Sequence, residues 1–368
     1  MVAVTSSAAR GCHRDVKGVN VRAFYHPSQA AHDPQQYMRV GRVIAPKDVP
    51  ARTAALLGAL QSLDITPHAS TADYPDARAA VHTKGFLQFL ETAWERWQEL
   101  PERGPEVWPN TFPYWSGRPE DAARQECPAE HIIAQAGWYL GDLSVPMGPN
   151  TWLSVRESCN TAVTAADAVR KGERLAYALC RPSGHHTRSD RASGFCYVNN
   201  TAVAAQRLRG TFNRVAILDV DAHHGDGTQQ IFYGRPDVLT ISIHADPRNY
   251  YPFFTGYVEE IGIGDGAGSN LNLPLTHGST GGAMFRAVDR AAEAIQTFGA
   301  DALVVALGFD AHARDPIGVL KLESQDFAGI GTRVKDLKLP TVIVQEGGYA
   351  IDALGDCLTA FVTGLVAP

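Results

Sequence analysis

The fold of this chain is organised around the stretch Arg214-Val-Ala-Ile-Leu-Asp-Val-Asp-Ala-His-His-Gly-Asp-Gly-Thr228. Its first part, residues 215–218, is a short apolar run rich in β-branched side chains, which predicts a buried strand. Asp219, Asp221 and His223 follow at alternate positions, so an extended backbone directs all three side chains to one side. Two carboxylates and an imidazole aimed at one point are costly to bury unless a cation lies between them. Because Asp and His are ordinary zinc ligands, the stretch predicts a metal site; the alternative is a charged turn with solvated histidines.

Length and composition indicate an ordinary globular protein. The chain has 368 residues, of which 45% are hydrophobic and 20% are charged. No Gly/Ser-rich or charged linker divides its middle, so we expect one domain over residues 21–368 after a flexible N-terminal extension, residues 1–20. The net charge of −6 and the pI of about 6.1 argue against a nucleic-acid partner or an anionic membrane surface.

The cysteines and the N-terminal region indicate the cellular compartment. The N-terminal region has no signal-peptide core, and no run in the chain approaches about 18 continuous apolar residues. The six cysteines are scattered and form no C-x-x-C pair: Cys12, Cys127, Cys159, Cys180, Cys196 and Cys357. This usage is typical of reduced thiols, so we expect a soluble cytoplasmic protein without membrane contact.

Apolar periodicity along the chain alternates strands with helices. Strands are expected over residues 21–25, 175–179, 215–218, 238–243, 302–307 and 341–344. Helices are expected over residues 51–63, 82–100, 151–170 (with Thr151 as N-cap), 200–208, 280–298, 324–337 and 351–365. This alternation predicts an α/β fold with a mostly parallel central sheet and helices on both faces.

Three stretches lack a clear period and are expected to be loops: residues 26–50, 101–149 and 253–268. The second of them mixes prolines, tryptophans and charges, and long loops in compact proteins are usually functional or form interfaces. We therefore expect residues 101–149 to form a lid or a dimer arm. The aromatic stripe of the preceding helix is expected to be core or subunit contact rather than a cofactor site.

Polar residues follow several of the predicted strands. They are His185 and His186, Asp221 and His223, His244, Asp310, and Tyr349. In open α/β sheets, sites lie beyond the carboxyl ends of the strands. We therefore expect these side chains to converge on one metal centre, with Asp310 as the third ligand. Three protein ligands leave one coordination position open, which is typical of a catalytic zinc.

The remaining polar residues suit proton transfer around such a metal. The adjacent His185 and His186 can act as general base and as acid or electrostatic partner near neutral pH. Each needs a carboxylate to orient it, and Asp219 and Asp226 are available. Tyr349 can donate its hydroxyl to a developing oxyanion. Each residue also has a structural alternative: a surface loop for the histidine pair, a helix cap for Asp310, and turn acceptors for Asp219 and Asp226.

Five ordered motifs together resemble the histone deacetylase / acetylpolyamine amidohydrolase family. They are Arg181-Pro-x-Gly-His-His186, Gly194-Phe-Cys-Tyr-Val-Asn-Asn200, Asp219-Val-Asp-x-His-His-Gly-Asp-Gly-Thr228, Gly308-Phe-Asp310 and Glu346-Gly-Gly-Tyr349. The resemblance runs from about residue 20 to the C-terminus. It implies an arginase-like α/β fold and a zinc hydrolase that removes acetyl or other acyl groups from amines.

The resemblance also implies a role for each matching position. Asp221, His223 and Asp310 resemble the zinc ligands; His185 and His186 resemble the catalytic histidines, backed by Asp219 and Asp226; Tyr349 resembles the transition-state tyrosine. Gly194 and Phe195 resemble one wall of the acyl channel, and Tyr251 the opposite wall, where the family often has Phe. The family also binds a structural K⁺, which would here use Asp219, Ser242, the backbone of Ile243, and the backbones of Asp221 and His223.

The substrate is the least specified part of the resemblance. The aromatic helix and the 101–149 arm look most like the bacterial acetylpolyamine branch, in which the arm helps to form a homodimer and narrows the site. Ser144 and Ile133 stand where carboxylates for the distant ammonium of a polyamine are expected, and Asp142 is the nearest acidic residue. We expect small acylated amines as substrates. The alternatives are a protein acetyl-lysine deacetylase and a non-catalytic module that binds acyl amines.

Overall fold

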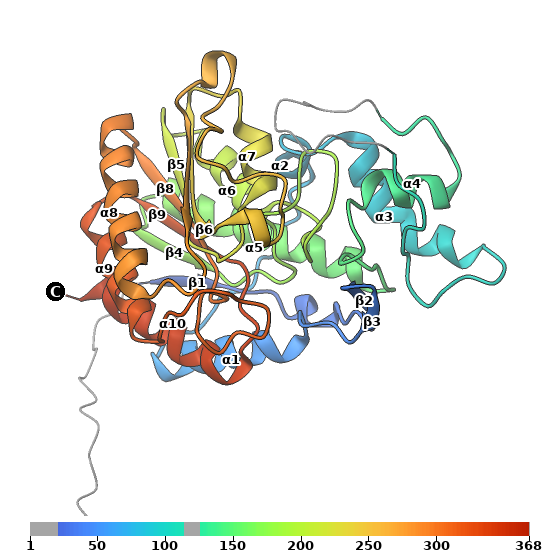
Figure 1. Ribbon diagram of the computed structural model, residues 1–368, viewed down its shortest axis with the longest axis horizontal. Helices are drawn as coiled ribbons and strands as arrows, with labels where there is room; N and C mark the ends of the chain where they lie inside the picture. The colour runs from blue at the N-terminus through green and yellow to red at the C-terminus, as the bar shows by residue number, and fades with distance from the viewer. Residues whose placement is uncertain (1–20, 114–125, 368) are drawn as a thin grey trace, which may run out of the picture.

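The structure, a computed structural model, describes residues 21–113 and 126–367. Within these residues the chain forms a seven-stranded sheet in the order β1-β4-β9-β8-β5-β6-β7, and every neighbouring pair is parallel. The strands are β1 (Arg22–Phe24), β4 (Leu175–Ala178), β5 (Val215–Asp219), β6 (Val238–Ala245), β7 (Asn270–Leu275), β8 (Ala302–Leu307) and β9 (Thr341–Gln345). The predicted parallel α/β architecture is confirmed (Figure 1).

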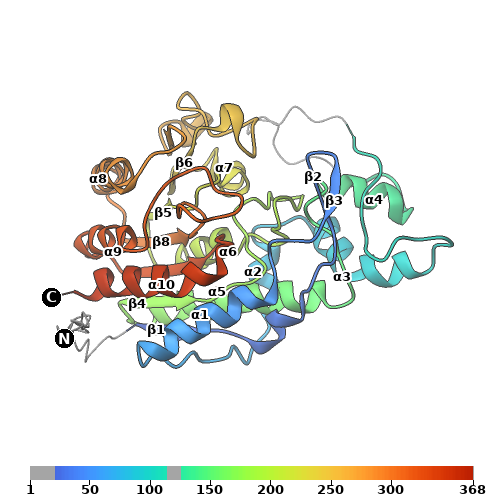
Figure 2. The same ribbon diagram turned by 60° about the horizontal axis from the view of Figure 1, so that its bottom comes forward.

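Helices cover both faces of this sheet. The helices among the described residues, of which α3 and α4 lie beside the sheet, are α1 (Pro50–Ser62), α2 (Pro75–Ala79), α3 (Lys84–Gln98), α4 (Ile132–Tyr139), α5 (Thr151–Arg170), α6 (Asn200–Leu208), α7 (Asp226–Phe232), α8 (Gly281–Phe298), α9 (Asp326–Asp336) and α10 (Ile351–Val366). Short 3₁₀ segments lie at Pro27–Ala31, Pro247–Asn249 and Gly264–Gly266. Figure 2 shows α8, α9 and α10 along one side of the sheet.

The packing of strand β5 explains why residues 215–218 are all apolar. Ala216 and Leu218 belong to a hydrophobic cluster shared with α1, α8, α9 and α10, whereas Val215 and Ile217 belong to a second cluster shared with α5 and α6. Successive side chains of a strand point to opposite faces, so a strand covered on both faces reads as a continuous hydrophobic run. The polar residues begin where this strand ends.

A third hydrophobic cluster lies beside the sheet and contains α3 and α4. The aromatic stripe of α3 is part of it, since Phe86, Phe89 and Trp97 are buried. The 101–149 excursion packs on this cluster through Val107, Met147 and α4, so it contains a helix that its sequence did not predict. Residues 114–125, within the predicted arm, lie outside the described residues, as does the predicted N-terminal extension.

Several local predictions were wrong, each for a physical reason. The 26–50 loop contains a hairpin, β2 (Tyr37–Arg39) and β3 (Arg42–Ile44), whose turn uses Val40 and Gly41 at positive φ instead of a recognisable Asn-Gly pair. Strand β7 was not predicted, because it contains Pro274. The proline is tolerated there because β7 is an edge strand.

The helix cap predicted at residue 151 was also wrong. Asn150 is the N-cap of α5 and makes no side-chain cap bond, whereas the Thr151 hydroxyl accepts the Gly148 N–H at 2.9 Å. The cysteine prediction agrees with the structure, because the five cysteines among the described residues are free. One sheet takes strands from positions 22 to 345, and the domain boundaries themselves stay a prediction. No described helix combines the length and apolarity needed to span a bilayer.

Candidate metal centre and active site

The order of the strands explains how distant motifs meet. Strands β4, β9, β8 and β5 are consecutive neighbours in the sheet and run parallel, so their carboxyl ends share one edge. The loops that follow these four strands carry, in that order, the histidine pair, Tyr349, Asp310, and Asp221 with His223. Side chains that are up to about 160 positions apart in the chain therefore lie at one place.

Asp221, His223 and Asp310 form the centre of this edge. Their candidate ligand atoms all lie within 4.8 Å of one another. The Nδ1 atom of His223 is 2.8 Å from Asp310 Oδ2 and 3.2 Å from Asp221 Oδ1. The ring of Tyr250 stacks on the His223 ring at 4.6 Å and fixes its plane. All three side chains are buried, so the donor set is shielded from bulk water.

The chemistry of this donor set fits a divalent cation. Among the described residues, the salt-bridge partners of Asp221 and Asp310 are imidazoles, and no Lys or Arg forms a salt bridge with either carboxylate. Burial, followed by the charge of Asp221, raises the pKa of Asp310 to about 7. Burial opposes the charge of His223, but the two carboxylates raise its pKa to about 10. The two buried carboxylates and the imidazole between them are therefore stabilised by added positive charge, which a metal ion would supply.

Glycines leave room around the two carboxylates. A Cβ atom at Gly347 would lie 2.5 Å from an oxygen of Asp221 and 2.5 Å from an oxygen of Asp310. The backbone N–H of Gly347 instead donates to Asp221 Oδ2 at 2.9 Å. The N–H of Ala222 donates to Asp310 Oδ1 at 2.7 Å. The His223 N–H donates to Asp221 Oδ1 at 2.9 Å, so backbone groups hold both oxygens of Asp221 and one oxygen of Asp310 in place, as ligand-orienting contacts do.

The tandem histidines each contact one carboxylate. His185 Nδ1 lies 2.9 Å from Asp219, and His186 Nδ1 lies 2.8 Å from Asp226, which also accepts from Arg188 at 3.0 Å. Both rings are buried and their centroids are 4.1 Å apart. With Nδ1 engaged, the Nε2 atom of each ring is the one left for chemistry.

The two histidines experience opposite electrostatic environments. Burial alone would lower the pKa of His185, but the charges of Asp219 and Asp221 raise it well above its usual value. Burial, followed by repulsion from His185, lowers the pKa of His186 to about 4 despite its contact with Asp226. A pair of adjacent imidazoles with separated pKa values suits one acidic and one basic role.

Tyr349 is positioned by two residues that the sequence did not single out. Its backbone N–H donates to Asp315 Oδ2 at 2.7 Å, and the Arg52 guanidinium lies 4.7 Å from its ring centroid. Arg52 also donates to the carbonyls of Glu346 and Gly348, which belong to the same loop. Burial raises the pKa of Tyr349 well above its usual value, so its hydroxyl keeps its proton.

A cavity of about 570 Å³ opens onto these residues. His186, His223 and Tyr349 line it together with Phe195 and Tyr251. The Phe195 ring is 5.6 Å from the Tyr349 ring, and the Tyr251 ring is 5.0 Å from the His186 ring. The two aromatic side chains predicted as channel walls therefore both border the cavity.

Gly194 and Asp142 complete the wall on the Tyr251 side. Gly194 has a positive φ, and a Cβ atom there would lie 2.4 Å from the His186 ring. The Tyr251 hydroxyl donates to Asp142 Oδ2 at 2.7 Å, and Asp142 Oδ1 accepts from Ser144. Asp142 thus lines the cavity, with both carboxylate oxygens already bonded inside the protein.

His244 does not join the site, so this part of the prediction was wrong. Strand β6 continues to Ala245, and His244 is therefore a strand residue and not a strand-end residue. Its Nε2 lies 2.9 Å from the Gly256 carbonyl, its Nδ1 lies 2.9 Å from Ser242 Oγ, and its ring packs on His224. Asp219 and Ser242, expected at a structural cation, are register partners across β5 and β6, and Ile243 follows in β6.

Comparisons with known proteins cover almost the whole chain. Residues 47–365 match the model of the histone deacetylase domain. The chain is 44% identical to an acetylpolyamine amidohydrolase of Burkholderia pseudomallei over 94% of its own length and 98% of the relative. It is 39% identical to acetylpolyamine amidohydrolase 1 of Pseudomonas aeruginosa, over 90% and 95% of the two chains. A crystal structure of acetylpolyamine aminohydrolase from B. pseudomallei superposes with a TM-score of 0.89 at 43% identity, covering 94% of this chain and 99% of that one.

Proposed function

The chain belongs to the histone deacetylase family, and we propose that it is a zinc-dependent amidohydrolase that removes acetyl or other acyl groups from small amines, above all acetylpolyamines. The relatives named for acetylpolyamine hydrolysis cover almost all of this chain, which supports the substrate class. The observation that carries the proposal is the convergence of Asp221, His223 and Asp310 beside a histidine pair and a tyrosine at one cavity.

We propose that Asp221, His223 and Asp310 hold the catalytic ion. Two carboxylates and one imidazole are a ligand set that zinc accepts, and three protein ligands leave a coordination position for substrate. When bound, the ion would supply Lewis acidity towards the acyl carbonyl and towards water. A second, structural cation, K⁺, is proposed at Asp219, Ser242 and the Ile243 backbone, because the first two are buried neighbours in the sheet.

The chain's own residues would perform the proton transfers. His186 and His185 would accept the proton of the attacking water and return it to the leaving amine through their Nε2 atoms. Asp226 and Asp219 would keep each Nδ1 protonated and each ring oriented. The protonated hydroxyl of Tyr349 would donate to the oxyanion that develops on the acyl oxygen. Phe195 and Tyr251 would hold a slim acyl chain between them.

The proposal is tested by a panel of acylated amines. Acetylputrescine and acetylcadaverine would be assayed beside an acetyl-lysine peptide, each with and without a hydroxamate chelator. We expect hydrolysis of the small amines, full inhibition by the hydroxamate, and a higher kcat/KM for the amines than for the peptide. A metal-loaded protein that hydrolyses none of these amides would contradict the proposal and would favour a non-catalytic module that binds acyl amines.

A second candidate, a protein acetyl-lysine deacetylase, is favoured by the rim of the cavity. Among the described residues lining it, Asp142 is the one carboxylate, and both of its oxygens are bonded to neighbours. The exposed Arg39 also lines the cavity and would repel a distant ammonium. Preference for the peptide over both diamines would assign this function instead.

We also propose a homodimer formed through residues 101–149, acting in the cytoplasm. The support for the dimer is the length of this excursion and the exposed Phe112 within it. Sedimentation equilibrium at micromolar concentration should give the mass of two chains. The mass of a single chain under these conditions would contradict the dimer.

A further inference from the structure

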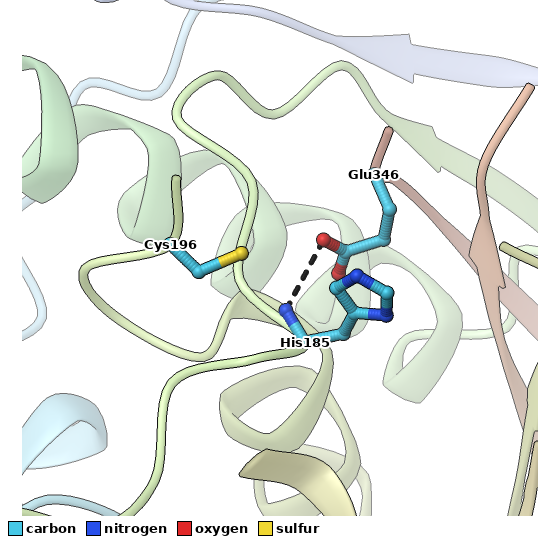
Figure 3. A group of neighbouring side chains, drawn as sticks. All are labelled: His185, Cys196 and Glu346. Carbon is cyan, nitrogen blue, oxygen red and sulfur yellow. Dashed lines mark hydrogen bonds between the residues drawn. The ribbon is translucent and has the colours of Figure 1, made fainter. Parts of the chain in front are cut away.

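The carboxylate of Glu346 connects the two loops that carry the candidate catalytic residues. Its Oε2 accepts the backbone N–H of Gly184 at 2.7 Å. The same oxygen accepts the backbone N–H of His185 at 3.2 Å, the contact drawn in Figure 3. Its Oε1 accepts the hydroxyl of Thr201, in the first turn of α6, at 2.7 Å. One side chain in the loop after β9 therefore holds the backbone of the loop after β4.

The backbone of Glu346 and Gly347 is itself held in place by hydrogen bonds. The Glu346 N–H donates to the Leu307 carbonyl at 2.9 Å, and the Glu346 carbonyl accepts from Arg52 at 2.7 Å. The next N–H, of Gly347, donates to the carboxylate of Asp221. Tyr349 lies three residues beyond Glu346. The side chain of Glu346 thus links a fixed loop that carries Tyr349 to a loop that carries the histidine pair.

Burying a carboxylate this far from solvent costs free energy that a purely structural link would not require. Glu346 is fully buried, and among the described residues no Lys or Arg forms a salt bridge with it. Burial is the main reason that its pKa is raised to about 7, with the nearby His185 acting in the opposite direction. Apolar packing would fill the space at lower cost. What only an acceptor can supply here is the capture of two adjacent backbone N–H groups.

Cys196 lies beside this contact, but the group formed by His185, Cys196 and Glu346 is better explained without a metal. Candidate ligand atoms of His185, Cys196 and Glu346 lie within 4.8 Å of one another (Figure 3). Both oxygens of Glu346 already accept hydrogen bonds, and burial raises the pKa of the Cys196 thiol well above its usual value. A protonated thiol is a poor metal ligand, because the thiolate is the ligating form.

We propose that Glu346 is a positioning residue that sets the distance between the tandem-histidine loop and the tyrosine loop by accepting the Gly184 and His185 amides. This inference rests on the proposed hydrolysis. Misplacement of reacting groups by about 1 Å can cost about 10²-fold in rate, so loss of this link should lower kcat. Metal affinity should stay, because Glu346 contacts none of the three candidate ligands through its side chain.

The test compares E346A with E346Q, and uses D301A as a matched control. An amide oxygen in E346Q can still accept both backbone N–H groups, whereas alanine cannot. Asp301 also accepts two adjacent backbone N–H groups, those of Asn213 and Arg214 at 3.0 Å each, and it precedes β8, at the opposite edge of the sheet from both loops. For each variant kcat, KM, zinc per chain and hydroxamate affinity would be measured below the thermal transition.

We expect E346A to lower kcat by about 10²-fold with KM and zinc content unchanged, and E346Q to retain most of the activity. D301A should leave kcat unchanged. A wild-type kcat in E346A, an equal loss in E346Q and E346A, or the loss of a second zinc ion in E346A would each overturn the proposal.

A second readout does not depend on activity. Amide hydrogen exchange of the peptide that contains Gly184 and His185 should be faster in E346A, while in E346Q and D301A it should match the wild type. Unchanged exchange in E346A would overturn the proposal even if the rate fell. If the wild-type protein hydrolysed no acylated amine, the proposed function would fail, and the exchange result would still decide whether the link exists.

Discussion

At the scale of single residues, the hydroxyl of Tyr349 and the imidazole of His186 are the groups that should matter most for rate. Both line the cavity, and neither is among the candidate ligands. We predict that Y349F and H186A each lower kcat by about 10²-fold or more, since each removes one oxyanion donor or proton carrier. Zinc content should remain at the wild-type value. A near-wild-type kcat in either variant would contradict the assigned roles.

Gly347 gives a prediction about metal binding alone. An added Cβ atom would lie 2.5 Å from oxygens of both Asp221 and Asp310, so one carboxylate must move. We expect G347A to weaken zinc binding by about 10- to 100-fold, the usual scale for contacts that orient ligands. The control is G58A in the exposed part of α1, where a Cβ atom meets nothing within 4 Å. Competition with a chromogenic chelator measures both, and equal affinities would exclude the crowding argument.

His82 gives a prediction about pH and stability. Its Nδ1 contacts the Arg188 carbonyl at 3.1 Å, and its Nε2 accepts the Asn199 N–H at 3.0 Å, so the neutral ring satisfies both. Burial lowers its pKa to about 4, against about 6.5 in the unfolded chain. The unfolded state therefore binds the proton first, and the stability from His82 is complete above pH 6.5 and is lost as the pH falls towards 4.

The variant H82Q tests this dependence, because glutamine can donate and accept at the same two places without titrating. Between pH 7.5 and pH 5 we expect the wild type to lose about 2 kcal/mol more of its free energy of unfolding than H82Q loses. The remaining histidines contribute equally to both proteins. Urea unfolding measures both losses. If the wild type and H82Q lost the same free energy of unfolding between the two pH values, His82 would not change its protonation on unfolding.

The residues that carry the chemistry could be recognised in the sequence, whereas the residues that position them could not. Asp221, His223 and Asp310 follow apolar strands, which marks them without a structure. Arg52, Asp315 and Glu346 act on backbone groups that are remote in sequence, so the sequence assigned none of them a role. Two signals were available: Glu346 lies within the Glu346-Gly-Gly-Tyr349 motif, and Arg52 is a charged residue four positions before Leu56 on the apolar face of α1.

At the scale of elements, α1 and the loop after β9 are connected by Arg52. Its guanidinium is fully buried and donates to Asp48 as well as to the Glu346 and Gly348 carbonyls. We predict that R52M costs about 3 kcal/mol of the free energy of unfolding, because Asp48 then keeps Arg181 as its one remaining guanidinium partner in the interior. It should also lower kcat, because the tyrosine loop loses two bonds.

The matched control for R52M is R290A. Arg290 pairs with Glu293 at 3.1 Å on the exposed face of α8, where such pairs contribute little. Urea unfolding at 25 °C should therefore separate the two variants clearly. An R52M protein as stable as R290A would show that the buried guanidinium contributes no net stability.

The strands that were missed share a cause. The 26–50 hairpin and β7 both depend on tertiary contacts that override local sequence: an unusual Val-Gly turn in one and an edge position that tolerates Pro274 in the other. Long periodic helices such as α8 and fully apolar strands such as β5 were predicted within one or two residues. Elements specified by their own sequence could be read from it, and elements specified by their neighbours could not.

At the scale of the whole molecule, the strand order creates the site. β4 and β5 are close in sequence, yet β9 and β8 lie between them in the sheet, so the last third of the chain supplies Asp310 and Tyr349 to a centre begun by the middle third. No pattern within the sequence contains this order. The convergence of the polar residues was predicted from the rule that sites lie beyond the carboxyl ends of parallel strands, and the resemblance to a known family, which the comparisons then established, agreed with it.

The central claim is that Asp221, His223 and Asp310 share one divalent ion, and anomalous diffraction at the zinc edge tests it most directly. From crystals of protein loaded with one equivalent of zinc, we predict a single strong peak per chain, about 2.0–2.2 Å from one atom of each of the three side chains. No peak at this place, or a peak beside Cys196 and Glu346 instead, would contradict the account.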